Sequence, residues 1–176
     1  WIAEKLKQKT GAGIIMTGQH PSAFAGEVIT KTDMVIQGDF LLPVLNFFRN
    51  GYPHYYKTIC PYSTRNNINA NILPFPEDDD ISRFDYAVNG DPICRYREIQ
   101  VYASRGCPYS CSYCVATNSH FGRPLWQPRN ISNIIAELEY LFNKYEDAEG
   151  VFFDDEIHNA NTLFNKALAR AIIDAG

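Results

Sequence analysis

Apolar and polar positions along the first part of the chain predict a short helix, two strands and a second helix. An amphipathic stretch over 1–10 has apolar residues four apart among Lys and Glu, which is typical of a helix. Apolar runs of buried-strand length follow at 13–17 and 34–37, and each leads into a glycine-containing turn. Apolar positions at helical spacing over 42–50 predict the second helix. This order is typical of the final part of a doubly wound parallel sheet, of the α/β class, over residues 1–51.

The last part of the chain repeats a strand and a helix twice. Residues 99–103 alternate as a strand, and 150–154 are a short apolar run. Apolar stripes at helical spacing follow at 130–145 and 163–176. Because consecutive parallel strands need a crossover connection, the order strand, helix, strand, helix predicts parallel strands with right-handed crossovers over 98–176.

Between these two parts the periodicity fades. Pro, Asn, Tyr and Asp accumulate over 52–97, for example in the acidic run 77–80. A structureless stretch of this length is unusual inside one compact domain. We therefore interpret 52–97 as a connector between two domains.

The composition is that of a folded protein without a marked affinity for polyanions. The 176 residues are 45% apolar and 20% charged, and 16 Lys and Arg against 20 Asp and Glu give a net charge of −4. These values exclude disorder as the dominant state, and the lack of a Lys/Arg block argues against a nucleic-acid partner. No apolar run is long enough to span a membrane, and we expect a cytoplasmic protein. The chain starts at Trp1 within a helical pattern, so we expect an internal segment of a longer protein.

Three of the five cysteines form a cluster in one loop. Cys107, Cys111 and Cys114 stand at CxxxCxxC spacing directly after the predicted strand 99–103. Thiolates are the preferred ligands of iron–sulfur clusters, and one compact loop can wrap three of them around a cubane. Three protein ligands would leave one metal position open for an exogenous molecule. The spacing therefore favours an iron–sulfur site.

Two other interpretations of the cluster remain open. Zinc held by the three cysteines and His120 is one, although structural zinc sites usually pair two distant CxxC-like segments. A disulfide with one spare thiol is the other, although an odd cysteine count without a secretory leader does not favour it. Cys60 and Cys94 are interpreted as ordinary thiols, and Cys94 lies near enough in sequence for a role beside the substrate.

The segment Arg105-Gly106-Cys107 through Cys114 resembles the signature of the radical S-adenosylmethionine (radical SAM) enzymes. In that superfamily a CxxxCxxC loop with an aromatic residue before the last cysteine follows the first strand of a partial (β/α)6 barrel, and Tyr113 fills the aromatic position here. The resemblance implies a 4Fe-4S cluster on the three cysteines, with S-adenosylmethionine on the open iron. Reductive cleavage of S-adenosylmethionine would then give a 5′-deoxyadenosyl radical that abstracts a substrate hydrogen.

An acidic segment ends the second predicted strand. Asp154, Asp155 and Glu156 are similar to the end of the second barrel strand in this superfamily, where a polar residue contacts the amino group of S-adenosylmethionine. Alternation places Asp154 and Glu156 on the barrel side if Phe153 faces the helices. The alternative is a solvated loop that caps the following helix.

Residues 13–51 resemble the last part of the cobalamin-binding domain that precedes the radical module in one large subgroup. The matching residues are 17–22 and 33–39, and the subgroup often has Gly-Gly and Gly-Glu at the two turns that read Thr17-Gly18 and Gly38-Asp39 here. The resemblance implies that Gly18 and Gly38 line a cofactor site. Leu73-Pro74-Phe75-Pro76 also resembles the connector of that subgroup. Cobalamin is thus a further cofactor implied for the longer protein, whose earlier residues would carry most of its site.

Our leading hypothesis is an internal segment of a cobalamin-type radical SAM enzyme, with the end of one Rossmann-like domain and the first two β/α units of the barrel. The resemblance implies C–H activation, with methyl transfer as the commonest outcome, a small-molecule substrate, and an external electron donor such as a flavodoxin or ferredoxin. We expect the segment alone to be inactive. The alternatives are a non-catalytic iron–sulfur or zinc-binding module, and a radical enzyme whose first domain has lost cobalamin.

Overall fold

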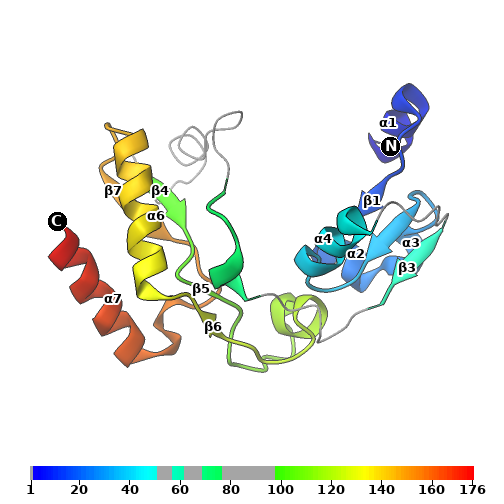
Figure 1. Cartoon of the computed structure of the whole chain (residues 1–176). Coiled ribbons are helices and arrows are strands. Elements are labelled where there is room, and N and C mark those ends of the chain that lie inside the picture. Colours follow the sequence, from blue (N-terminus) through cyan, green and yellow to red (C-terminus); the bar gives the residue numbers. More distant parts are fainter. Residues whose placement is uncertain (1, 51–56, 62–68, 77–97) are drawn as a thin grey trace. The chain divides into compact units, whose positions relative to one another are not determined.

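The computed structural model describes residues 2–50, 57–61, 69–76 and 98–176 (Figure 1). The chain divides into two compact units. Unit 1 comprises residues 1–68 and 108–125, and unit 2 comprises residues 69–107 and 126–176. Most of the predicted connector 52–97, with Cys94, lies outside the described residues.

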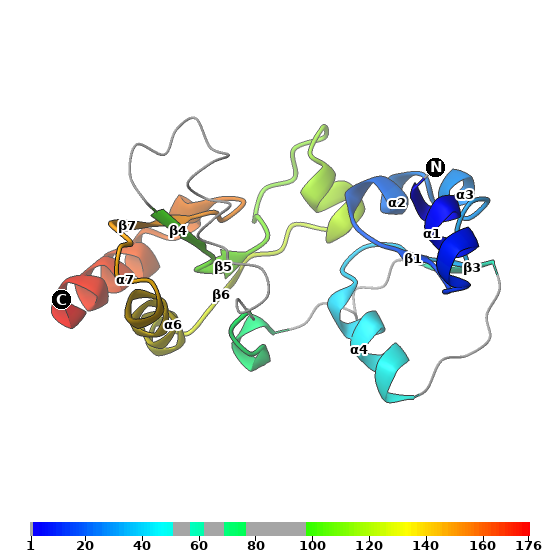
Figure 2. The same cartoon turned by 90° about the horizontal axis from the view of Figure 1, so that it is seen from above.

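Unit 1 is built around a parallel sheet with the strand order β1-β2-β3. Its elements are α1 (Ile2–Thr10), β1 (Ile15–Met16), α2 (Gln19–Ala23), α3 (Ala25–Val28), β2 (Met34–Ile36), α4 (Leu41–Arg49), β3 (Thr58–Cys60) and the π-helical turn η3 (Ala116–His120). Figure 2 shows α2 and α3 on one side of the strands and α4 on the other. All three residues of β2 are buried accordingly, with Val35 packed against Ala25 and Val28.

The expected helices and strands of residues 1–51 are confirmed, with two additions. The segment between β1 and β2, expected as a loop, contains α2 and α3. The third strand, β3, falls within the range expected to be connector and pairs in parallel with β2, Val35 opposite Ile59. The three residues of β3 carry too little periodicity to predict a strand from sequence. They form one because they pair with the central strand β2.

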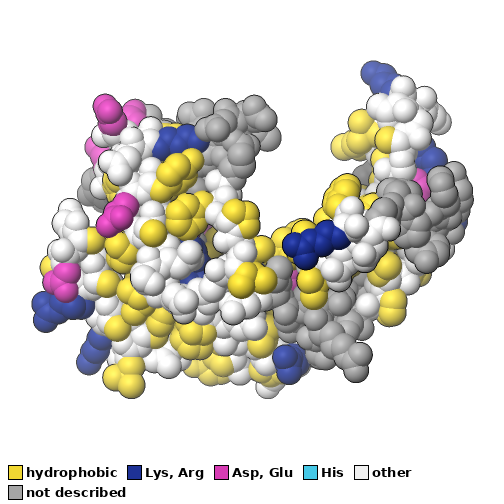
Figure 3. All heavy atoms as spheres, viewed as in Figure 1, with side chains coloured by type: hydrophobic (Ala, Val, Ile, Leu, Met, Phe, Trp, Pro, Cys, Tyr) yellow, Lys and Arg dark blue, Asp and Glu magenta, His cyan; other side chains and the backbone are white. Residues whose placement is uncertain are grey.

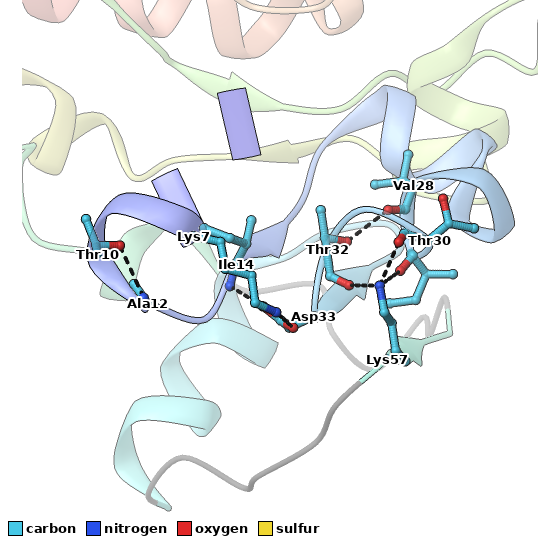
Figure 4. A network of polar contacts seen from close by, with 10 residues as sticks. Lys7, Thr10, Ala12, Ile14, Val28, Thr30, Thr32, Asp33 and Lys57 are labelled. Atoms are coloured by element: carbon cyan, nitrogen blue, oxygen red, sulfur yellow. Dashed lines mark hydrogen bonds and ion pairs between the residues drawn. The ribbon is translucent and has the colours of Figure 1, made fainter. Parts of the chain in front are cut away.

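Charged side chains secure the edge of the unit 1 sheet where the strands begin (Figure 4). The Asp33 carboxylate accepts from the Lys7 ammonium group and, at 2.9 Å, from the backbone N–H of Ile14. These bonds hold the pKa of Asp33 below its ordinary value, with the Lys7 bond as the largest cause. Lys57 donates to three carbonyls that follow α3, those of Ile29, Thr30 and Thr32, at 2.7–3.1 Å.

Unit 2 contains a parallel strand pair and a short antiparallel pair. Its elements are η2 (Ala70–Ile72), β4 (Glu98–Val101), β5 (Ser104–Arg105), β6 (Gln127–Pro128), α6 (Ile131–Lys144), β7 (Gly150–Phe153), η4 (His158–Ala160) and α7 (Thr162–Ala175). β4 and β7 pair in parallel, Val101 opposite Phe153, which confirms the expected parallel strands. β5 and β6 pair at the base of the segment 106–126.

The core of unit 2 lies between the β4–β7 sheet and two helices. Figure 2 shows α6 and α7 on the same side of the two strands. The buried residues of this core are Ile99, Val101, Ala103, Ile134, Leu138, Leu141 and Leu168, with Val151 and Phe153 packed against them. Phe153 therefore faces the helices, which is the condition under which alternation directs Asp154 to the opposite face of the sheet.

A buried ion pair joins the beginning of α6 to the end of β4. Arg129 donates to Glu137 at 2.6 Å, and the two side chains are 10% and 3% exposed. Arg129 also donates from its guanidinium group to the Tyr102 carbonyl at 2.7 Å and from its backbone N–H to the Ala103 carbonyl at 2.9 Å. A charge buried at this depth needs a partner, so the pair stabilises the junction only while both members are present.

Both helices of unit 2 begin at asparagine, but only one asparagine caps through its side chain. Asn161 accepts from the N–H groups of Leu163 and Phe164, both at 3.0 Å, at the start of α7. Asn130 occupies the N-cap position of α6, but its side chain makes no capping bond.

Within the described part of the chain, none of the helices has the length and apolar character needed to cross a membrane. On the face drawn in Figure 3, Lys and Arg side chains lie apart from one another and do not form a continuous patch.

Candidate functional site

The cysteine loop, residues 105–114, and the acidic segment, residues 154–156, start from neighbouring strands of unit 2. The cysteine loop follows β4 through β5, and the acidic segment follows β7. Because β4 and β7 are parallel, their carboxyl ends lie at the same edge of the sheet. Ligand sites of parallel sheets form at this edge.

Asp155 binds the end of β4. Its Oδ1 accepts from the N–H groups of Ala103 and Ser104 at 2.8 and 3.0 Å, and its Oδ2 lies 2.9 Å from Nδ1 of His158. The side chain is 1% exposed. Both carboxylate oxygens are therefore used to satisfy backbone and imidazole groups where the strand stops pairing.

Glu156 binds the residue that precedes the first clustered cysteine. Its Oε2 accepts from the N–H of Gly106 at 2.9 Å. Gly106 has a φ of 81°, in the left-handed region where a residue with a Cβ atom is strained. The turn before Cys107 is thus set by a glycine and held by a carboxylate that comes from the other strand.

Asp154 is one of the two exposed residues of the acidic segment. Its Oδ2 accepts from the Tyr102 hydroxyl at 3.3 Å. Burial raises the pKa of Tyr102, and the nearby charge of Asp154 raises it further. Sequence reasoning missed Tyr102, although its place next to β4, opposite the acidic segment, follows once the two strands are paired.

The three clustered cysteines lie in both compact units. Cys107 is half-buried and belongs to unit 2, whereas Cys111, exposed, and Cys114, half-buried, belong to unit 1. These three and Cys60 form no disulfide with one another. Among the residues that the structure describes, no three Cys, His, Asp or Glu side chains are gathered as a metal site. The iron–sulfur and zinc assignments therefore stay predictions based on the donor set.

The second half of the cysteine loop forms a compact turn within unit 1. The Cys114 N–H donates to the Cys111 carbonyl at 3.1 Å. Asn118 lies beside this turn, and its side-chain amide donates to the carbonyls of Cys111, Ser112 and Cys114 at 3.0, 3.3 and 2.8 Å. Tyr113 is 86% exposed, and its hydrogen bond with Cys111 raises the pKa of the tyrosine. Sequence reasoning missed Asn118.

The two turns expected to line a cofactor site in unit 1 are brought together by one buried hydroxyl. The Ser22 Oγ donates to the Gly18 carbonyl and accepts from the Gly38 N–H at 2.8 Å. Both glycines have positive φ values, 102° and 82°, and both follow strands of the parallel sheet. The Ser22 carbonyl also accepts from the Gln37 amide at 2.9 Å. The two turns are therefore adjacent, and Ser22, a residue of the matching segment 17–22 to which no role was assigned, joins them.

Cys60 and the histidine of the zinc alternative, His120, both belong to unit 1. Cys60 ends β3, and burial raises the pKa of its thiol, as expected for an ordinary structural cysteine. His120 ends η3, and its ring packs edge-to-face with that of Phe121, with 4.7 Å between the ring centroids. Cys94 lies outside the described residues.

Comparison with known proteins gives one partial relative. No family model matches the chain, and no solved structure matches it. A Pyrococcus horikoshii protein named as an uncharacterized methyltransferase is 31% identical over 87 residues, which cover 49% of this chain and 17% of the relative. The chain therefore spans much less than two thirds of that relative.

Proposed function

We propose that the chain is part of a radical SAM enzyme, in which Cys107, Cys111 and Cys114 hold a 4Fe-4S cluster. The observation that carries the proposal is the direct attachment of the acidic segment to the start of the cysteine loop, through Glu156 and Gly106. When bound, the cluster would supply the electron that cleaves S-adenosylmethionine and so starts C–H activation.

The donor set fits such a cluster. Three thiols without disulfides stand within eight residues, and thiolates are the ligands that iron–sulfur clusters take. Gly106 makes the turn before the first thiol, and the bond from Cys114 to Cys111 makes the turn between the other two. The protein would contribute these two turns already formed, which lowers the entropic cost of gathering the ligands.

The residues of the acidic segment have two different roles in this proposal, one structural and one in ligand binding. Both oxygens of Asp155 are used by Ala103, Ser104 and His158, so this residue positions the loop. Asp154 and Glu156 are exposed, and each has one carboxylate oxygen with no partner among the described residues. These two oxygens are therefore our candidates for the ammonium group of S-adenosylmethionine.

Methyl transfer is the reaction we propose for the whole protein, with cobalamin as the second cofactor. Its support is the methyltransferase name of the partial relative and the adjacent Gly18 and Gly38 turns at the edge of the unit 1 sheet. A small-molecule substrate and an external electron donor of the flavodoxin or ferredoxin kind complete the proposal.

Anaerobic reconstitution with iron and sulfide tests the cluster. We expect about four iron and four sulfide per chain, from the cubane stoichiometry, and loss of both when the three cysteines are changed to alanine. Cys60→Ala is the matched control and should keep the cluster, because Cys60 lies in β3. Tight zinc binding with no incorporation of iron would contradict the proposal.

A second assay separates a radical enzyme from a non-catalytic cluster-binding module. The reduced, reconstituted chain is incubated with S-adenosylmethionine, and 5′-deoxyadenosine is measured. Formation of 5′-deoxyadenosine supports the enzyme, and a stable cluster without it in the longer protein supports the module.

A further inference from the structure

We propose that Asn118 is a positioning residue that holds the backbone turn between Cys111 and Cys114, two of the proposed cluster ligands. This inference rests on the proposed cluster. It goes beyond it by assigning a role to a residue outside the cysteine loop, in the π-helical turn η3.

One side-chain amide contacts three consecutive or near-consecutive carbonyls. Nδ2 of Asn118 lies 3.0 Å from the Cys111 carbonyl oxygen, 3.3 Å from that of Ser112 and 2.8 Å from that of Cys114. All three partners are acceptors, so the amide nitrogen, and not its oxygen, must face the loop. The two hydrogens of the amide are shared among three oxygens, and this geometry is available only while the carbonyls converge.

Backbone bonds place Asn118 next to the same turn. Its own N–H donates to the Cys114 carbonyl at 3.2 Å, and the Cys114 N–H donates to the Cys111 carbonyl. The turn and the side chain that binds it are thus two parts of one short hydrogen-bonded structure. A residue that binds both ends of the interval between two ligands fixes the spacing of those ligands.

The turn η3 gives Asn118 a rigid support. Thr117 is 3% exposed and Phe121 is 1% exposed, and the Phe121 N–H donates to the Ala116 carbonyl at 2.8 Å. Single π-helical turns are rare and occur frequently at functional sites. The buried neighbours anchor the backbone of η3 while the Asn118 side chain itself stays exposed.

This arrangement makes a substitution at Asn118 a clean test. Because the side chain is exposed, its replacement leaves the buried residues of η3 in place, and the expected loss is local. Outer-shell partners that orient metal ligands are worth about 10–100-fold in metal affinity. We expect a loss in this range for cluster retention.

The decisive variant is Asn118→Asp, which keeps the shape of the side chain but replaces the donating amide by a carboxylate that the three carbonyls repel. Asn118→Gln keeps the donors on a longer side chain. Asn143→Asp is the matched control, since Asn143 is an exposed asparagine of α6 with no hydrogen bond among those described. Each variant is made in the full chain.

The first readout needs no cluster. Alkylation of the apoprotein is followed for each cysteine by mass spectrometry, with Cys60 as an internal reference. We expect Asn118→Asp to change the relative alkylation rates of Cys111 and Cys114, and Asn143→Asp to leave them unchanged. Rates in Asn118→Asp equal to those of the unchanged protein would overturn the inference.

The second readout follows the reconstituted cluster. Asn118→Asp should lose iron to a chelator about 10–100-fold faster and alter the electron paramagnetic resonance spectrum of the reduced cluster, with Asn118→Gln in between. Equal losses in the Asp and Gln variants would contradict the role of the donating amide. If the unchanged protein takes up no cluster, the proposed function fails, whereas the alkylation result still decides whether Asn118 holds the turn.

Discussion

The two units carry loops at the carboxyl ends of parallel strands, but they hold these loops with different chemistry. In unit 1 a neutral, buried hydroxyl, that of Ser22, joins the Gly18 and Gly38 turns. In unit 2 Asp155 and Glu156 bind the backbone of Ala103, Ser104 and Gly106. A hydroxyl that donates once and accepts once keeps one uncharged acceptor lone pair, whereas a carboxylate group keeps negatively charged acceptor capacity after it has bound an amide.

This difference indicates which edge is suited to a charged ligand. The unit 2 edge combines the bond from Gly106, at the start of the cysteine loop, to Glu156 with the exposed carboxylates of Asp154 and Glu156. The unit 1 edge has two glycines with positive φ values, joined by the uncharged hydroxyl of Ser22. This difference is why we propose an ammonium-bearing ligand for the unit 2 edge and close backbone approach by a neutral group for the unit 1 edge.

The largest expected effect comes from the buried ion pair behind the unit 2 edge. Glu137→Ala leaves the Arg129 charge buried without its carboxylate and should lower the free energy of unfolding of unit 2 by about 3–5 kcal/mol. Urea unfolding combined with hydrogen exchange of unit 2 amides measures this. Glu139→Ala, at an exposed position of α6, is the control and should change stability little. Equal effects of the two variants would show that the buried ion pair does not stabilise unit 2.

The next effect tests the bonds by which Asp155 holds the backbone at the carboxyl edge of the unit 2 sheet. Asp155→Ala removes two charge-assisted bonds to backbone N–H groups, and we expect a loss of about 3 kcal/mol at about 1.5 kcal/mol for each bond. Hydrogen exchange should show the Ala103 and Ser104 amides losing protection, while that of the Gly38 amide is kept. Unchanged protection at 103 and 104 would show that Asp155 does not hold the strand end. Asp174→Asn, at the exposed end of α7, serves as the control.

A smaller, pH-dependent effect belongs to the opposite edge of unit 1. The bonds from Lys7 and Ile14 lower the folded-state pKa of Asp33 below its unfolded value of about 3.9. The stabilisation is therefore fully present above that value and is lost as the pH falls through the folded-state pKa. Asp33→Asn should remove about 2 kcal/mol at neutral pH and flatten the acid side of the stability profile. A variant with the same acid dependence as the unchanged protein would contradict this assignment.

The smallest effect tests the Ser22 hydroxyl that joins the Gly18 and Gly38 turns of unit 1. Ser22→Ala leaves the Gly38 N–H without its acceptor, but the Gly18 carbonyl keeps a bond from the Ser22 backbone at 3.1 Å. We expect a loss of about 1 kcal/mol, with faster exchange of the Gly38 amide. A loss as large as that of Asp155→Ala would mean that the two edges do not differ in the way described.

The fold could be predicted from sequence where periodicity is long or the apolar run is bounded by glycine. The helices α6 and α7 and the strands β2 and β7 fall in this class. β3 and the β5–β6 pair have only two or three residues each, so tertiary pairing decides them. Glu137 was a usable signal, because a charged residue between Ile134 and Leu138 on an apolar stripe needs a buried partner.

The candidate site was predictable as residue types but not as contacts. The spacing of the cysteines and the position of the acidic segment follow from sequence alone, and parallel pairing of β4 and β7 places the start of the cysteine loop and the acidic segment at one edge. The bond from Gly106 to Glu156 depends on a strand end that turns, which alternation does not describe. Asn118 was missed because side-chain bonds to carbonyls in an irregular turn leave no periodic pattern.

The central claim is that the acidic segment and the cysteine loop together bind a cluster and S-adenosylmethionine. The most direct measurement is the electron paramagnetic resonance spectrum of the reduced, reconstituted protein before and after S-adenosylmethionine is added. We predict a 4Fe-4S signal that changes on addition, and in Asp154→Ala a signal of the same amount whose response needs more S-adenosylmethionine. A cluster signal that S-adenosylmethionine leaves unchanged at any concentration, or no cluster at all, would contradict the account.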